Sequence, residues 1–219
     1  VYAGMPDFDK WATGQENGTH WVPAESDVSI RPGWYYHAYE DHKVKTLPEL
    51  MEIYYKSIGQ NSSLLINFPV DTRGLIHEKD EEAILKMAAK IKEDFAVNLA
   101  KDASFEASAD RGKGYTADLL NDGDFNTFWT TPDGQLQASV EVDFGKTVSF
   151  NRLLIQEFVN LGQRVKAFSL EKEVNGNWEK IAEGTTIGYK RILRFSDTEA
   201  QKIRINFLDG KGIPVISEI

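Results

Sequence analysis

The 219-residue sequence contains no cysteine. This absence excludes a disulfide framework, a thiolate metal site and a cysteine nucleophile, although it leaves the cellular compartment open. No apolar run approaches the roughly 20 residues that span a bilayer, so we expect no membrane span. Basic residues are also fewer than acidic ones, with 25 Lys and Arg against 34 Asp and Glu and a formal net charge of -9. Nucleic-acid binders concentrate basic residues on one face, and we therefore expect no nucleic-acid partner.

The sequence does contain enough apolar residues for a core, since 41% are hydrophobic and 11% aromatic. At this length we expect a folded protein of one large domain or two ordinary ones. The chain opens with "VYAGMPD", without an initiator methionine, and closes with "PVISEI", which has the pattern of a strand. We therefore expect it to be part of a longer polypeptide.

The first half of the chain has the pattern of an α/β unit. In "TLPELMEIYYKSIGQN", Thr46 and Glu49 form a capping box, apolar residues follow at helical spacing, and Gly59 is the predicted C-cap. "SLLINFP" is an uninterrupted apolar run, which predicts a strand buried on both faces as in parallel sheets. A second helix is predicted over residues 80–100, with acidic residues at its start and lysines further along. Helix, buried strand and helix together indicate α/β structure.

After about residue 100 the pattern changes to short strands separated by turns. "SVEVDFG" and "KIRINF" alternate apolar and polar residues, and Asn175-Gly176 predicts a hairpin turn. This pattern is typical of an all-β sandwich. The expected domains are residues 1–98, of α/β class, and residues 99–219, of all-β class.

One polar and aromatic ribbon, "WVPAESDVSIRPGWYYH", has the composition of a sugar site. Trp21 and Trp34 offer faces on which a sugar ring can stack, and Glu25 and Arg31 can hydrogen-bond to hydroxyl groups. The same composition also fits a surface loop whose tryptophans pack against a neighbouring helix. On composition alone both interpretations stay open.

The order of the segments is more specific than the composition. This ribbon, followed by "LPELMEIYYKSIGQNSSLLINFPVDTRGLIHEKD", closely resembles the end of the catalytic domain of the alpha-L-fucosidases of glycoside hydrolase family 29. The resemblance covers about residues 10–95. It implies that the first domain is the C-terminal part of a (β/α) barrel and that the substrate is a fucosylated glycan. It implies no organic cofactor.

The resemblance also bears on catalysis, because the family is retaining and needs two carboxylates about 5 to 5.5 Å apart. The Trp-Phe-Asp-Gly-like and Gly-Asn-Glu motifs that carry these groups in the family do not occur here. We therefore expect both catalytic carboxylates in the upstream part of the same polypeptide. Glu25 is kept as an acid/base candidate, and Trp21, Glu25, Arg31 and Trp34 are the predicted substrate contacts.

A second motif, "YTADLLNDGDFNTFWTT", resembles the discoidin or coagulation-factor type C domain, a jelly roll known as a carbohydrate-binding module. The resemblance covers about residues 103–219 and implies a structural calcium ion. By position its ligands would be Asp122, Asp124, Thr127 and Glu218, a set of oxygens that suits calcium. The alternative is an Asp-Gly turn whose side chains cap their own backbone without a metal. Trp129 is predicted to be a core residue.

The predicted protein is the C-terminal portion of a secreted or periplasmic bacterial exo-alpha-L-fucosidase with an appended β-sandwich. The sandwich either binds glycans, through tips such as "NLGQRV" and "TIGYKR", or braces the enzyme. The alternative function is a non-catalytic carbohydrate-binding protein in which the sandwich binds the ligand and the α/β part is scaffold.

Overall fold

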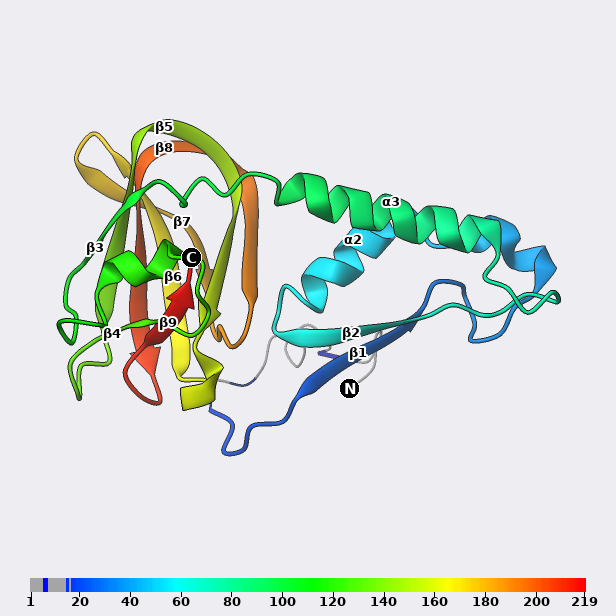
Figure 1. Cartoon of the computed structure of the whole chain (residues 1–219), viewed down its shortest axis with the longest axis horizontal. Coiled ribbons are helices and arrows are strands. Elements are labelled where there is room, and N and C mark those ends of the chain that lie inside the picture. Colours follow the sequence, from blue (N-terminus) through cyan, green and yellow to red (C-terminus); the bar gives the residue numbers. More distant parts are fainter. Residues whose placement is uncertain (1–5, 8–14, 16) are drawn as a thin grey trace. The chain divides into compact units, whose positions relative to one another are not determined.

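The computed structural model describes residues 6–7, 15 and 17–219. The chain divides into two compact units, one of Val22–Asn98 and one that contains Leu99–Ile219. Figure 1 shows the helices α2 and α3 in the first unit and most of the strands in the second. The two units are of the α/β and all-β classes expected from the sequence. No helix in the described part of the chain is both long and apolar enough to cross a membrane.

The first unit is built on a pair of parallel strands. Its elements are β1 (Ala24–Ser29), the 3-10 helix η1 (Ala38–Lys43), α2 (Leu47–Lys56), β2 (Ser62–Asn67) and α3 (Glu78–Asp94). The β1 and β2 strands pair from Ala24 opposite Ser62 to Ser29 opposite Asn67. A parallel pair needs a crossover connection, and here η1 and α2 provide it. The pairing brings the carboxyl ends of both strands to one edge.

Helix α2 begins as the sequence predicts. The capping box is present, with Thr46 N and Thr46 Oγ1 donating to Glu49 Oε2 at 2.8 and 2.7 Å. The helix ends earlier than expected, because its C-cap is Ser57 and not Gly59. Gly59 still has a backbone reason to be glycine: a Cβ there would lie 2.5 Å from Tyr55 O.

Strand β2 differs from its prediction in one respect. The apolar run predicts burial on both faces, yet Leu65 is 55% exposed. Figure 1 shows α2 and α3 on the same side of the β1–β2 pair. Helix α3 ends at Asp94, short of the predicted residue 100, and its buried residues are Asp80 and Met87.

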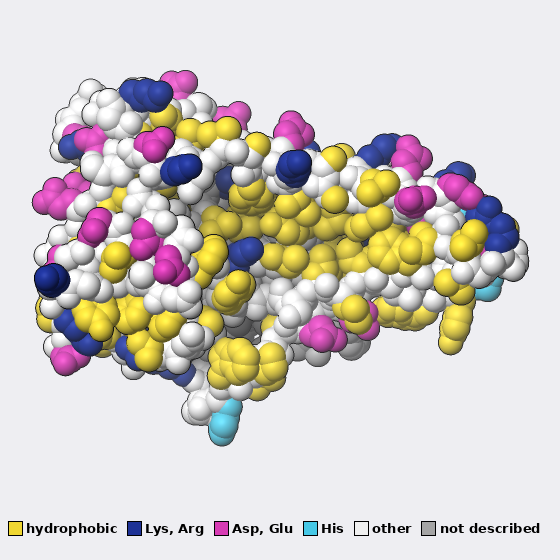
Figure 2. Space-filling view, viewed as in Figure 1, with side chains coloured by type: hydrophobic (Ala, Val, Ile, Leu, Met, Phe, Trp, Pro, Cys, Tyr) yellow, Lys and Arg dark blue, Asp and Glu magenta, His cyan; other side chains and the backbone are white. Residues whose placement is uncertain are grey.

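Hydrophobic side chains are exposed over the first unit. Figure 2 shows them gathered over its elements. They include Trp34, Tyr35, Tyr39, Leu65, Val70, Leu75, Ile76 and Leu85. Exposed apolar patches of this kind mark surfaces that contact another protein element or a ligand.

The second unit is a curled antiparallel sheet. Its strands are β3 (Ser104–Ala107), β4 (Trp129–Thr130), β5 (Ala138–Glu157), β6 (Val165–Val174), β7 (Asn177–Gly184), β8 (Arg191–Gly210) and β9 (Val215–Glu218). The strand order is β4-β9-β5-β8-β6-β7, and β3 pairs with β5. The long β5 pairs with β8 along most of its length and with β9 at its end. It therefore links the two layers of the sandwich.

The core of the sandwich lies between these layers. Trp129 is fully buried in it, packs against Phe207 with ring centroids 5.4 Å apart, and donates from Nε1 to Ala109 O at 3.1 Å. The prediction that Trp129 is a core residue is therefore confirmed. The hairpin prediction is confirmed as well, since Asn175 and Gly176 join β6 to β7 with φ of 52° and 79°.

Candidate functional site

The ribbon of the first unit places Trp34 at the carboxyl edge of the parallel strands. Ser29 ends β1, and its Oγ donates to Gly33 O at 2.7 Å. Asn67 ends β2, and its Nδ2 donates to Trp34 O at 3.1 Å. The indole is 51% exposed. In (β/α) barrels this edge carries the active site, so the turn holds Trp34 where a substrate contact is expected.

Arg31 has a different environment from the one its predicted role requires. Its side chain is fully buried, and Nε donates to both carboxylate oxygens of Asp80 at 3.1 and 2.8 Å. Nη1 donates to Asp41 Oδ1 at 2.9 Å, and this hydrogen bond holds the pKa of the Asp41 carboxyl below its ordinary value. The guanidinium also lies over the Tyr36 ring, 4.7 Å from its centroid. Arg31 thus ties the ribbon to η1 and α3 and is not exposed to a ligand in solution.

The other two predicted contacts are exposed. Glu25 is the second residue of β1, near the amino end of the strand; its side chain lies in solvent, and its backbone pairs with Ser63. Trp21 is 68% exposed but is grouped with the sandwich unit. Of the four residues, Glu25, Arg31 and Trp34 therefore share a unit.

The Asp-Gly-Asp turn of the sandwich brings three of the predicted calcium ligands together. Asp122 Oδ1 accepts from Asp124 N at 2.8 Å. Thr127 Oγ1 lies 2.7 Å from Asp122 Oδ2 and 2.8 Å from the carbonyl oxygen of Asp124. One carboxylate, one hydroxyl and one carbonyl oxygen converge, which are the oxygen types that calcium prefers.

The fourth predicted ligand, Glu218, comes from the far end of the chain. Burial, together with the negative charges of Asp122 and Asp124, raises the pKa of Glu218 to about 7, although a bond from the Gly123 backbone N–H opposes the shift. Its Oε1 is buried without a hydrogen-bond partner among the described residues. A cation would satisfy this oxygen and relieve the repulsion.

No cluster of three Asp, Glu, His or Cys side chains in the described part of the chain has a metal-binding arrangement by itself. A calcium ion at this turn would therefore need the carbonyl oxygen of Asp124 and the hydroxyl of Thr127 beside the carboxylates. The residues fit calcium better than zinc, which prefers nitrogen and sulfur ligands.

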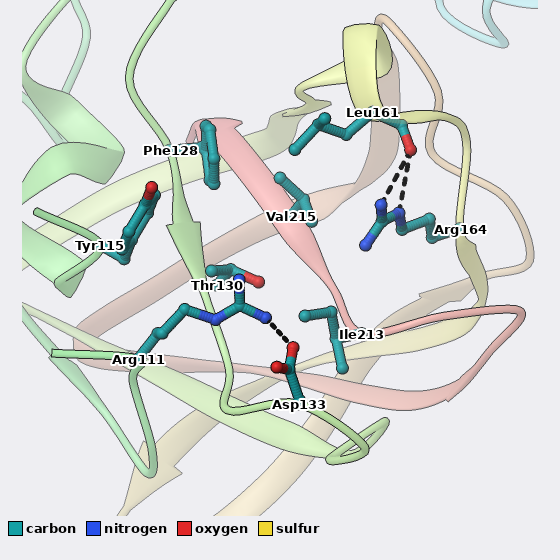
Figure 3. A pocket seen from close by; sticks show the side chains of 9 residues that line it. All are labelled: Arg111, Tyr115, Phe128, Thr130, Asp133, Leu161, Arg164, Ile213 and Val215. Carbon is teal, nitrogen blue, oxygen red and sulfur yellow. Dashed lines mark hydrogen bonds and ion pairs between the residues drawn. The ribbon is translucent and has the colours of Figure 1, made fainter.

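A cavity of about 370 Å³ opens on the sandwich. It is lined by Arg111, Tyr115, Phe128, Thr130, Asp133, Leu161, Arg164, Ile213 and Val215. Figure 3 shows Tyr115 and Phe128 on one side, Arg164 on the opposite side, and the Arg111–Asp133 ion pair below them. The rings of Tyr115 and Phe128 lie 5.1 Å apart, and Phe128 stacks on Phe158 at 4.8 Å. The volume lies within the range of small-molecule sites, and the lining is mixed aromatic and polar.

Sequence reasoning found only part of this cavity. The "NLGQRV" tip contains Leu161 and Arg164, but Arg111, Tyr115 and Asp133 were not predicted. Arg111 and Tyr115 both precede the Asp-Gly-Asp turn in the sequence, so an arginine and an aromatic residue shortly before that turn were the available signal. The "TIGYKR" tip does not line the cavity.

Comparison with known proteins now identifies the class of the chain. Residues 104–219 match the F5/8 type C domain. The chain therefore belongs to the F5/8 type C domain family.

Its relatives are more specific, and the resemblance to family 29 fucosidases is confirmed. The chain is 36% identical over 211 residues to Alpha-L-fucosidase 1 of Arabidopsis thaliana, with 93% of this chain and 41% of that protein covered. It superposes on a Ruminococcus gnavus GH29 fucosidase in complex with fucose with a TM-score of 0.86 and 34% identity, covering 94% of this chain and 42% of the other. The structure of SpGH29 gives a TM-score of 0.87 and 36% identity, covering 94% and 45%. The chain thus spans about two fifths of the length of the curated relatives that it matches.

Proposed function

We propose that the polypeptide containing this chain is a retaining exo-alpha-L-fucosidase that removes terminal alpha-L-fucose from glycans. The observation that supports this most strongly is the extent of the similarity, since fucosidases align with 93–94% of the chain and so with both units. A non-catalytic carbohydrate-binding protein, the alternative function, would need only the sandwich. It is not favoured, because the first unit also resembles fucosidases.

The catalytic carboxylates belong, in this proposal, to an upstream part of the same polypeptide. A retaining mechanism needs a nucleophile and an acid/base group about 5 to 5.5 Å apart. The exposed apolar side chains over the first unit fit contact with further barrel elements. This chain would supply part of the rim of the pocket through Trp34, with Arg31 and Asp80 holding the rim in place. Glu25 lies near the amino end of β1, away from the carboxyl edge that carries Trp34. Secretion or a periplasmic location stays a prediction.

The test is hydrolysis of 4-nitrophenyl alpha-L-fucoside by the full polypeptide and by the 219-residue chain, measured side by side. Activity in the full polypeptide alone supports the proposal. Activity in the 219-residue chain would place a catalytic group within it and make Glu25 the first candidate. Inactivity of a folded full polypeptide would overturn the enzyme function.

Replacing Trp34 with alanine in the full polypeptide is expected to lower kcat/KM about tenfold or more. The exposed indole at the carboxyl edge would lose its contact with the sugar ring, and each loss of about 1.4 kcal/mol of transition-state binding lowers kcat/KM tenfold. Trp178→Ala is the matched control, because Trp178 lies in β7 of the sandwich unit, where the Arg204 guanidinium lies over its ring at 4.3 Å. Equal kcat/KM values for the two variants would remove Trp34 from the site.

The sandwich, in the same proposal, binds one structural calcium ion. Asp122, Thr127, Glu218 and the carbonyl group of Asp124 would hold it. When bound, the ion supplies positive charge that lets Glu218 ionise in its buried position. The geometry that supports this is the convergence of these oxygens and the unpaired Oε1 of Glu218.

A further inference from the structure

The charges that line the cavity of the sandwich do not cancel. Arg111 forms an ion pair with Asp133, so these two groups compensate each other. Arg164 forms no ion pair with a carboxylate among the described residues, and its guanidinium bonds only to a backbone carbonyl. The chain as a whole has a net charge of -9. The Glu157 carboxylate lies close enough to interact with the Arg164 charge, but it bonds to backbone N–H groups and not to the guanidinium. The guanidinium therefore keeps N–H groups that can pair with the carboxylate of a ligand.

The buried carboxylate of Glu157 fixes the backbone of Arg164. Glu157 is 2% exposed, and its Oε1 accepts from Arg164 N at 2.8 Å and from Val165 N at 2.9 Å. Its Oε2 accepts from Gly188 N at 2.7 Å, which joins the neighbouring loop to the same group. The Glu157 oxygens are thus engaged with backbone groups and face away from solvent. They hold the loop that carries Leu161 and Arg164.

The Arg164 side chain is fixed as well. Nε and Nη2 donate to Leu161 O at 3.1 and 2.9 Å. The stem of the side chain passes over Gly212, where a Cβ would lie 3.3 Å from Arg164 Cδ. The guanidinium therefore loses little conformational freedom when it binds a ligand. This preorganisation lowers the entropic cost of binding.

We propose that this cavity binds a sugar that carries a carboxylate group, that is, a uronic-acid residue of a glycan. The guanidinium of Arg164 would pair with the planar carboxylate through the N–H groups that do not bond to Leu161 O, a pairing that arginine geometry favours. The opposite wall, Tyr115 and Phe128, would contact the apolar face of the ring. Of the two roles left open for the sandwich, glycan binding and bracing of the enzyme, this proposal takes the first, and it does not depend on hydrolysis of fucose.

The test is isothermal titration calorimetry of the full polypeptide with two matched pairs of sugars. D-galacturonic acid is compared with D-galactose, and D-glucuronic acid with D-glucose, because the members of each pair differ only at C6. At least one acid is expected to bind ten times more tightly than its neutral partner, and added salt should weaken only the acid. Because none of the four sugars contains fucose, the result is independent of fucosidase activity.

Two variants make the test specific. Arg164→Gln is expected to abolish the difference between acid and neutral sugar while leaving the melting temperature and the fucosidase activity unchanged. Lys166→Gln is the matched control, because it removes one positive charge two residues away, from an ion pair with Asp209 that does not line the cavity. This control should retain the preference for the acid.

Four results would overturn the proposal. One is equal affinity for the acid and neutral members of both pairs, and a second is the absence of binding by either acid. The third is an Arg164→Gln variant that still prefers the acid. The fourth is equally tight binding of D-galactose 6-sulfate, because the site would then recognise negative charge in general and not a carboxylate.

Discussion

Replacing Asp80 with alanine is expected to lower the free energy of unfolding of the first unit by about 3 to 5 kcal/mol. The Asp80 side chain is fully buried, and its two carboxylate oxygens accept hydrogen bonds from Arg31 Nε at 3.1 and 2.8 Å. Its removal leaves a buried arginine whose remaining carboxylate contact is Asp41. The measurement is urea unfolding of the full polypeptide combined with hydrogen exchange in peptides from residues 22–98.

The matched control is Glu82→Ala on the same helix. Glu82 pairs with Lys86 at 2.6 Å, but both side chains are largely exposed, so the expected loss is below about 1 kcal/mol. The double variant Arg31→Met, Asp80→Leu should recover most of the stability, because it leaves no buried charge unpaired. Similar losses for Asp80→Ala and Glu82→Ala would show that the Arg31–Asp80 pair does not hold the ribbon.

Calcium is expected to raise the stability of the sandwich by about 2.7 kcal/mol when its concentration is 100 times Kd. Chelation should remove this gain and lower the melting temperature of the sandwich. Without calcium, stability should fall as the pH rises from about 4.5 to about 7. The sign follows from the raised pKa of Glu218, about 7 in the folded protein, because the folded state then holds a proton that the unfolded state has released.

Calcium should reverse this pH dependence, because the ion binds the ionised carboxylate. Calorimetric melting with and without chelator across this pH range measures both effects. Glu218→Gln should abolish the calcium response and flatten the pH dependence, whereas Glu179→Gln, an exposed acid in β7, should change neither. A melting temperature that is the same with calcium and with chelator would favour the metal-free Asp-Gly turn.

The sequence alone determined the features that depend on near neighbours. The capping box of α2 needs only Thr46 and Glu49, and the β6–β7 hairpin needs only Asn175-Gly176, whose residues adopt positive φ. The alternation in β5 and β8 likewise follows from the period of a strand. The partners in these interactions are only a few residues apart in the sequence, so the order of the amino acids is sufficient to predict them.

Burial was harder to predict, because it depends on what packs against a segment. The apolar run of β2 indicated a strand, but its pattern could not show that Leu65 is exposed in this chain. The composition of the ribbon suggested that Arg31 contacts a ligand, since arginine commonly does so. A sequence pattern does not show which acidic residues are close to a given arginine in space.

Only the tertiary structure decided the long-range pairs. Arg31 and Asp80 are 49 residues apart, and the packing of α3 makes them one buried ion pair. Glu218 reaches the Asp122 turn because β9 pairs with the end of β5 and because Ile219 N donates to Leu120 O at 2.9 Å. The cavity with Arg164 depends in the same way on loops that Glu157 joins. The sequence determined the elements and the family, whereas contacts between distant residues were set by the strand topology, because it alone brings those side chains within bonding distance.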